Sequence, residues 1–258
     1  MQKPKKRGAI RLRFGTAYFR LKRHLFWRLG GTKFAKKHQN VLAHCHFSHS
    51  TPLLRNLRNA DPIFEQNKIV NLRICLPKIN LVTLQPGETF SFWKLVGKPT
   101  RRKGYLEGVA LHDGKFIGKT GGGLCHLSGF IYWMTLHTPL TITERHRHGY
   151  DTTPDKFFGS DATCFYNYKD LTIKNNTAQV FQLRLKIDTD HLVGEWASNR
   201  PPKVRYEIYE KEQSIREESW GGHTRHNRLH RKIFDMDNTL IGDEFVAENH
   251  AIMMHDPA

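Results

Sequence analysis

The sequence predicts an α+β fold: a single mixed domain in which a cysteine-bearing helix packs on a largely antiparallel sheet, preceded by a basic helical arm. Segments with helical spacing and segments of alternating polarity are mixed along the chain without a regular strand–helix–strand order. The 16 Phe, 8 Tyr and 5 Trp supply a core for a chain of 258 residues. Residues 1–60 hold 15 Lys and Arg and no Asp or Glu. We therefore divide the chain into a basic amphipathic arm, residues 1–37, and an α+β domain, residues 38–258.

The role of the arm depends on what its apolar face covers. We expect residues 1–15 to be a disordered basic leader and residues 16–29 to form a helix that ends at Gly30-Gly31. The apolar positions of this helix recur at helical spacing: Tyr18, Leu21, Leu25 and Leu29. A basic amphipathic helix suits an anionic membrane surface, although the same face could instead pack on the body of the protein. Charge also permits nucleic-acid binding, but no recognised motif accompanies it, so we do not expect a nucleic-acid partner.

The sequence also favours one cellular compartment. No apolar run approaches the ~18 residues of a membrane span. The basic N-terminus is not followed by the apolar stretch of a signal peptide. Four cysteines are few for a secreted disulfide scaffold of this length. We therefore expect a cytoplasmic protein with reduced thiols, and a peripheral position at the inner face of the membrane if the apolar face of residues 1–37 binds lipid rather than the body of the protein.

The elements before residue 120 are marked by turn and helix-stop residues. Leu72 and Cys75 lie on one helical face, and Pro77 is expected to end that helix. Pro86-Gly87 and Asp113-Gly114 predict turns. The predicted elements are, in order, a helix over 62–77, strands over 80–84 and 89–92, and a hairpin with strands over 109–111 and 115–117.

The second half of the chain has one clear helix and several strands. Leu127, Phe130, Ile131 and Met134 follow one helical face, so a buried helix begins at or just after Cys125. The predicted strands are 140–146, a pair within 161–177, and single strands over 181–187 and 204–209. Asp237-Asn238 predicts a hairpin turn near the C-terminus.

The segment that says most about function has a cysteine two positions after three consecutive glycines. Gly121, Gly122 and Gly123 let the backbone approach a ligand and leave the first N–H groups of the helix free to bind it. Cys125 then lies at the positive end of the helix dipole, which lowers a thiol pKa and favours a nucleophile. The alternative is that Cys125 is a small buried core residue and the glycines only relieve crowding.

A nucleophilic cysteine needs a base, and three histidines are candidates. His146 is the first, because a strand over 140–146 would carry it beside the helix, with Asp161 on the next element to orient the imidazole. His126, adjacent to the cysteine, is the second candidate and His148 the third. A cysteine at a helix start, then a histidine, then an acid is the chain order of many cysteine hydrolases and acyltransferases.

At these residues the sequence resembles the VanW family, first found within vancomycin-resistance gene clusters. The resemblance extends from about residue 60 to the C-terminus and is carried by four motifs: Pro86-Gly87-Glu88-Thr89-Phe90-Ser91-Phe92, Leu95-Val96-Gly97, Gly121-Gly122-Gly123-Leu124-Cys125 and Glu144-Arg145-His146-Arg147-His148. The family pattern has Gln after the cysteine and then a pair of serines. Here His126 replaces the Gln and Gly129 replaces the second Ser, so the role of the neighbouring position is open.

The resemblance implies a cell-envelope role. Some cell-wall proteins with a VanW-like domain are credited with L,D-transpeptidase activity, in which the cysteine forms an acyl-enzyme. We therefore expect Cys-dependent acyl transfer on a peptide or a peptidoglycan precursor, linked to glycopeptide resistance and requiring no cofactor. The helix-start amides would serve as oxyanion donors. The expected substrate-binding residues are Gly121, Gly122, Gly123, Ser128 and Arg145. The alternative is a non-catalytic accessory or binding protein of the cell envelope.

Two other motifs carry less weight. Asp235 and Asp237 match the first motif of haloacid-dehalogenase phosphatases, but the 19 residues after Thr239 cannot build the domain that this chemistry needs. The His-rich segment His44-Cys45-His46 to His49 lacks a standard zinc spacing, so we expect no metal. Cys164 lies among apolar residues, and we expect it in a core strand.

Overall fold

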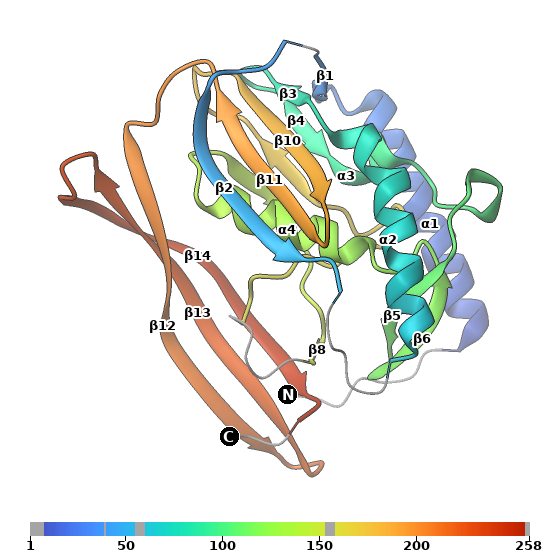
Figure 1. Ribbon diagram of the computed structural model, residues 1–258. Coiled ribbons are helices and arrows are strands. Elements are labelled where there is room, and N and C mark those ends of the chain that lie inside the picture. Colours follow the sequence, from blue (N-terminus) through green and yellow to red (C-terminus); the bar gives the residue numbers. More distant parts are fainter. Residues whose placement is uncertain (1–7, 39, 55–59, 153–157, 256–258) are drawn as a thin grey trace.

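The computed structural model describes residues 8–38, 40–54, 60–152 and 158–255, and it confirms the predicted α+β class. A five-stranded antiparallel sheet forms its centre (Figure 1). The strands are, in spatial order, β1 (Lys36–Lys37), β3 (Val82–Leu84), β10 (Phe181–Asp188), β11 (His191–Ser198) and β2 (His44–Pro52). The alternating apolar residues of β10 predict it correctly. The last two residues of the expected arm, in β1, belong to this sheet.

Two helices cover the central sheet. The helix α4 (Leu124–Leu136) contacts β11 and β2, and Leu127, Ile131 and Met134 are fully buried on the face that the sequence predicts. A side chain at Gly194 of β11 would lie 2.7 Å from Phe130, so the glycine lets this helix approach the sheet.

The helix α2 (Pro62–Ile79) lies beside α4 and is capped at its start. The Asp61 side chain accepts a hydrogen bond from Ile63 N. The expected end at Pro77 is wrong by two residues. Proline lacks an N–H, which costs the last turn one hydrogen bond, and Asn80 N still closes the helix on Leu76 O.

Smaller elements surround the start of α4. A three-stranded sheet has the order β4 (Thr89–Ser91), β9 (Thr172–Lys174) and β7 (Thr141–Glu144), and a hairpin pairs β5 (Glu107–His112) with β6 (Lys115–Thr120). In the sequence, α3 (Phe92–Val96) and the short helix η1 (Arg101–Lys103) lie between β4 and β5. The hairpin is as predicted. The strand pair within 161–177 is wrong, because β9 is the single strand there, together with an isolated bridge between Phe165 and Lys169.

A second, long sheet contains the C-terminal part of the chain. It consists of β12 (Val204–Glu218), β13 (Gly222–Asp235) and β14 (Leu240–Met253), with β8 (Tyr150–Asp151) added in parallel. Figure 1 shows these strands along the edge of the molecule opposite α1. The predicted turn at Asp237-Asn238 joins β13 to β14. Through β8, this sheet reaches the residues that follow β7.

The N-terminal helix α1 (Ala9–Leu29) lies at the outer edge of the molecule (Figure 1). It confirms a helix over residues 16–29 but corrects the disordered leader, since residues 9–15 continue the same helix. Those residues are mostly good helix formers, and Gly15 is the one breaker among them. Residues 1–7 of the expected leader lie outside the described residues. Within the described part of the chain, no helix combines the length and the apolar character needed to cross a bilayer.

Candidate active site

The glycines before α4 are required by close packing. A Cβ at Gly122 would lie 2.0 Å from Gly108 O of β5, and a Cβ at Gly123 would lie 2.2 Å from the Lys68 side chain of α2. Gly123 also has a φ of 87°, which strains any residue with a side chain. These two glycines therefore press the start of α4 against β5 and α2 and fix where Cys125 lies.

Cys125 is partly exposed in the first turn of α4 and lines a cavity. Its Sγ accepts a hydrogen bond from Cys164 N at 3.4 Å and lies 3.5 Å from Thr163 Oγ1. The Cys164 thiol is 3.8 Å away. Hydrogen bonding from Cys164, and the charge and hydrogen bond of His148, lower the pKa of Cys125 well below its ordinary value despite burial. These contacts therefore favour the thiolate, the form of cysteine that acts as a nucleophile.

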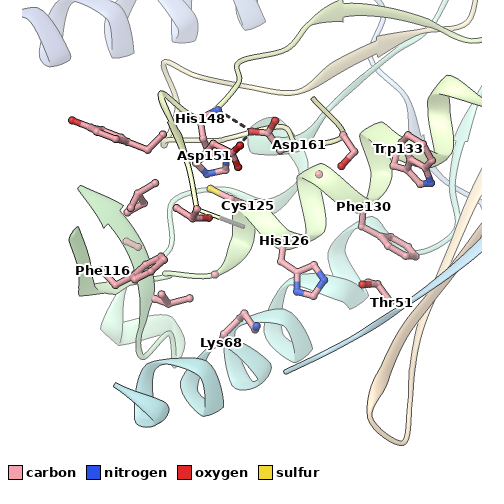
Figure 2. Close-up of a pocket in the computed structure, with 18 of the residues that line it drawn as sticks. Thr51, Lys68, Phe116, Cys125, His126, Phe130, Trp133, His148, Asp151 and Asp161 are labelled. Atoms are coloured by element: carbon pink, nitrogen blue, oxygen red, sulfur yellow. Dashed lines mark hydrogen bonds and ion pairs between the residues drawn. The ribbon is translucent and has the colours of Figure 1, made fainter. Parts of the chain in front are cut away.

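His148 and Asp161 interact with each other beside Cys125 (Figure 2). His148 Nδ1 lies 2.6 Å from Asp161 Oδ2, and the same oxygen accepts a hydrogen bond from His148 N at 2.8 Å. Burial lowers the pKa of His148, but hydrogen bonds and charges of Asp161 and Cys125 outweigh it and raise the pKa to about 9. The opposite shifts of the two pKa values favour the charged form of each group, a thiolate at Cys125 and an imidazolium at His148.

Arg145 holds Asp161 in place. It donates from Nε to Asp161 O at 2.8 Å and from Nη2 to Asp161 Oδ1 at 3.1 Å. It also donates to Gly159 O and to the Asn249 side chain of β14. Burial raises the pKa of Asp161, but His148 and Arg145 together lower it well below the ordinary value. The carboxylate therefore stays charged and keeps the imidazole oriented.

The structure does not place His146 with Asp161. Its Nε2 lies 2.9 Å from Glu144 Oε1, and Glu144 accepts two hydrogen bonds from Arg23 of α1 at 2.6 and 2.7 Å. The expected strand over 140–146 ends at Glu144, after a register shift between Ile142 and Glu144. The alternation of faces therefore stops before His146, which removes the basis for pairing it with Asp161.

His126 lies on the other side of the helix start from His148. Consecutive residues of a helix point about 100° apart, so it cannot share the direction of Cys125. Figure 2 shows its ring on the side of Lys68 and Phe130, within the same cavity. His126 is buried there, and its position suits contact with a substrate rather than with the thiol.

The cavity beside Cys125 has a volume of about 410 Å³. Its walls combine aromatic side chains with polar ones: Phe116, Phe130, Trp133, His49, Thr51 and Asp151. Such a size and mixture suit a ligand with amide groups, for example a segment of a peptide. The described side chains hold no group of three metal-ligating residues, and the His-rich segment 44–49 lies along β2.

Of the expected substrate-binding residues, the structure places Gly123 at the cavity wall. Ser128 is fully buried and donates to Ala162 O at 2.6 Å, and Arg145 is engaged by Asp161. Gly121 and Gly122 form the turn that leads into α4. The other four expected residues therefore do not line the cavity, and they support the elements that carry Cys125 and Asp161.

Cys164 is the residue that sequence reasoning missed. It is buried, as expected, but it lies outside any strand and next to Cys125. Burial and the neighbouring Cys125 raise the pKa of its thiol well above the ordinary value. No local pattern connects two cysteines 39 residues apart, so only the fold brings them together.

Comparison with known proteins identifies the family of this chain. Residues 67–197, about half of the chain, match the family described as VanW like protein. The chain belongs to the VanW family. The match includes Cys125, His148, Asp161 and Cys164, while α1 and the long strands β12, β13 and β14 lie outside it.

Two curated proteins match part of the chain. The vancomycin B-type resistance protein VanW of Enterococcus faecalis is 32% identical over 174 residues, which cover 66% of this chain and 63% of that protein. The uncharacterized protein YoaR of Bacillus subtilis is 30% identical over 116 residues, which cover 45% of this chain and 38% of that protein. The chain thus matches less than two thirds of the length of either relative. No solved structure matches it.

Proposed function

We propose that this protein is a cysteine acyltransferase that acts on a peptide substrate related to peptidoglycan and takes part in glycopeptide resistance. The observation that carries the proposal is the arrangement of Cys125, His148 and Asp161, with a low pKa at the thiol and a raised pKa at the imidazole. A nucleophile, a base and a group that orients the base are the parts that nucleophilic catalysis requires.

The geometry supports a two-step reaction. The Cys125 thiolate attacks the carbonyl carbon of a donor amide and forms a C–S bond, while the N–H groups at the start of α4 stabilise the oxyanion. His148 gives its proton to the leaving amine as the C–N bond breaks. An acceptor amine then attacks the thioester and transfers its proton to His148, which restores the thiolate. With water as acceptor, the same steps give hydrolysis.

Two observations support a peptide from the cell envelope as substrate. The cavity is large enough for part of a peptide and has polar groups on its walls. The E. faecalis relative carries vancomycin resistance in its name, and glycopeptides act on peptidoglycan precursors. Peptide amides and primary amines are the donor and acceptor groups of such precursors.

The first test measures alkylation of Cys125 by iodoacetamide as a function of pH. Because its pKa is lowered, Cys125 should react at pH 6 at least about tenfold faster than Cys45, which is exposed and whose pKa is raised. His148→Gln should shift the alkylation profile of Cys125 to higher pH, because the stabilising cation is lost. His146→Gln is the matched control and should leave the profile in place.

The second test looks for the acyl-enzyme itself. The protein is incubated with a muropeptide donor, and Cys125 is examined for a covalent adduct by mass spectrometry. We expect the adduct with the wild-type chain and none with Cys125→Ala. If no adduct forms and Cys125→Ala also retains its effect on glycopeptide susceptibility, the acyltransferase proposal is wrong and a non-catalytic accessory role takes its place.

A further inference from the structure

The helix α1 turns its apolar face away from the protein. Six large apolar or aromatic side chains lie on one stripe and are between 49% and 79% exposed: Ile10, Phe14, Tyr18, Leu21, Leu25 and Leu29. At about 3.6 residues per turn they fall within about 100° of the helix circumference. The alternative that this face packs on the body of the protein is therefore wrong. An exposed apolar stripe of this length marks an interaction surface.

The opposite face of α1 holds the helix to the body through polar contacts. Arg20 Nε donates to Tyr166 O at 3.0 Å, and Arg23 forms the paired hydrogen bonds with Glu144. Trp27 packs partly against the core, and its carbonyl accepts from Lys94 at 3.4 Å. These contacts fix the rotation of the helix about its own axis, so the outward direction of the apolar stripe is built into the fold.

The charges around the stripe are all of one sign. The described helix has no acidic residue, and Arg11, Arg13, Lys22 and Arg28 are exposed. Arg11 and Lys22 border the apolar stripe on one side and Arg13 borders it on the other, at about 100° per residue. Long basic side chains in these places can extend toward phosphate groups while their methylene stems cover apolar surface.

We propose that α1 docks this protein on the surface of an anionic lipid bilayer, lying parallel to the membrane with the stripe from Ile10 to Leu29 inserted among the acyl chains. Apolar burial and attraction to anionic headgroups together give such a helix its affinity. A second copy of the chain is the other occupant considered. It fits less well, because face-to-face packing of two α1 helices would bring their basic borders together with no acidic residue to offset them. The proposal is independent of the acyltransferase chemistry.

The test is co-sedimentation of the full chain with vesicles. Vesicles of phosphatidylcholine and phosphatidylglycerol in equal amounts are compared with vesicles of phosphatidylcholine alone. We expect binding to the anionic vesicles, weaker binding to the neutral ones, and a decline as salt shortens the Debye length below its physiological ~8 Å. Equal binding to both kinds of vesicle would overturn the role of the basic border.

Variants of exposed residues test whether vesicle binding depends on the α1 stripe or on exposed apolar side chains in general. The triple variant Leu21→Ser, Leu25→Ser, Leu29→Ser should lose about tenfold or more in vesicle affinity, since three apolar side chains no longer insert. The matched control is Leu240→Ser, Ile241→Ser, Phe245→Ser, whose residues are similarly exposed on β14 at the opposite edge of the molecule. Circular dichroism and thermal unfolding verify that both variants remain folded.

The outcomes are distinct. Loss of binding in the α1 variant with binding retained in the β14 variant supports the proposal. Equal affinity of the α1 variant and the wild type overturns it. Analytical ultracentrifugation without lipid tests whether the stripe instead binds a second copy of the chain. If the wild type is a dimer and the α1 variant is a monomer, the stripe is a dimer interface and membrane docking is overturned. Binding of a nucleic-acid duplex that the variant leaves unchanged, together with no vesicle binding, would also overturn it.

Discussion

The contact between α1 and the body predicts a large, pH-dependent contribution to stability from Glu144. Its carboxylate accepts two hydrogen bonds from Arg23, lies 2.9 Å from His146 Nε2 and accepts a bond from Asp170 N at 3.1 Å. Burial raises its pKa, but hydrogen bonds from His146 and Arg23 outweigh burial and lower the pKa from 4.5 to about 2. Replacement by Gln removes the charge and keeps the shape.

The expected magnitude follows from the change in pKa. Each pKa unit corresponds to about 1.4 kcal/mol, so the fall from 4.5 to about 2 corresponds to about 3 kcal/mol of stability. A lowered pKa in the folded state stabilises at pH values above the unfolded pKa, and the contribution is lost as the pH falls through the folded pKa. Glu144→Gln should therefore cost about 3 kcal/mol at pH 7 and only about half of that at pH 3.

Urea denaturation of the wild type and of Glu144→Gln at both pH values measures this difference. Comparing the two proteins at each pH cancels the titration of other carboxylates. Glu107→Gln is the matched control, because the ion pair of Glu107 with Arg101 is exposed and should contribute less than about 1 kcal/mol at either pH. A cost below about 1 kcal/mol at pH 7, or an equal cost at pH 3, would show that the charge of the Glu144 carboxylate does not stabilise the folded protein.

Two further predictions concern the start of α4. Gly123→Ala should destabilise the protein by more than about 2 kcal/mol in urea denaturation, because its Cβ would meet the Lys68 side chain, whereas Gly87→Ala, also at positive φ but in open space, should cost about 1 kcal/mol. Hydrogen peroxide should oxidise Cys125 to a sulfenic acid that condenses with the Cys164 thiol, with loss of water, to a disulfide. Intact mass should fall by two hydrogens and recover with dithiothreitol, and the same loss of mass in Cys164→Ser would contradict this pairing.

Local periodicity predicts the scaffold of the site well. The buried face of α4 and the position of Cys125 at its start follow from apolar residues at helical spacing after a run of glycines. The hairpin of β5 and β6 follows from its Asp113-Gly114 turn. In each case the deciding interactions lie within a few residues of one another, and such patterns can be identified in a single sequence.

The partners of Cys125 are harder to predict because they depend on where a strand stops. His146 and His148 would lie on the same face of a strand that continued the alternation of β7, so the alternation cannot predict which of them meets Asp161. The register shift after Ile142 is set by pairing with β9, which no pattern in 140–148 reveals. The position of Cys164 beside Cys125 likewise depends on the path of a segment without regular structure.

The sequence also does not predict which face of α1 contacts the domain, because that depends on the surface that the domain presents. The spacing of its apolar residues predicts a helix but not which face meets the domain. The domain presents the Glu144 carboxylate and the Tyr166 carbonyl at that surface, and buried polar groups of this kind require partners. Arg20 and Arg23 provide them, so the polar face of α1 turns inward and its apolar stripe must turn outward. Glu144 immediately precedes Arg145, which fixes Asp161, and the same short segment continues to His148. One stretch of chain thus anchors the outward-facing helix at one end and orients the base of the candidate site at the other.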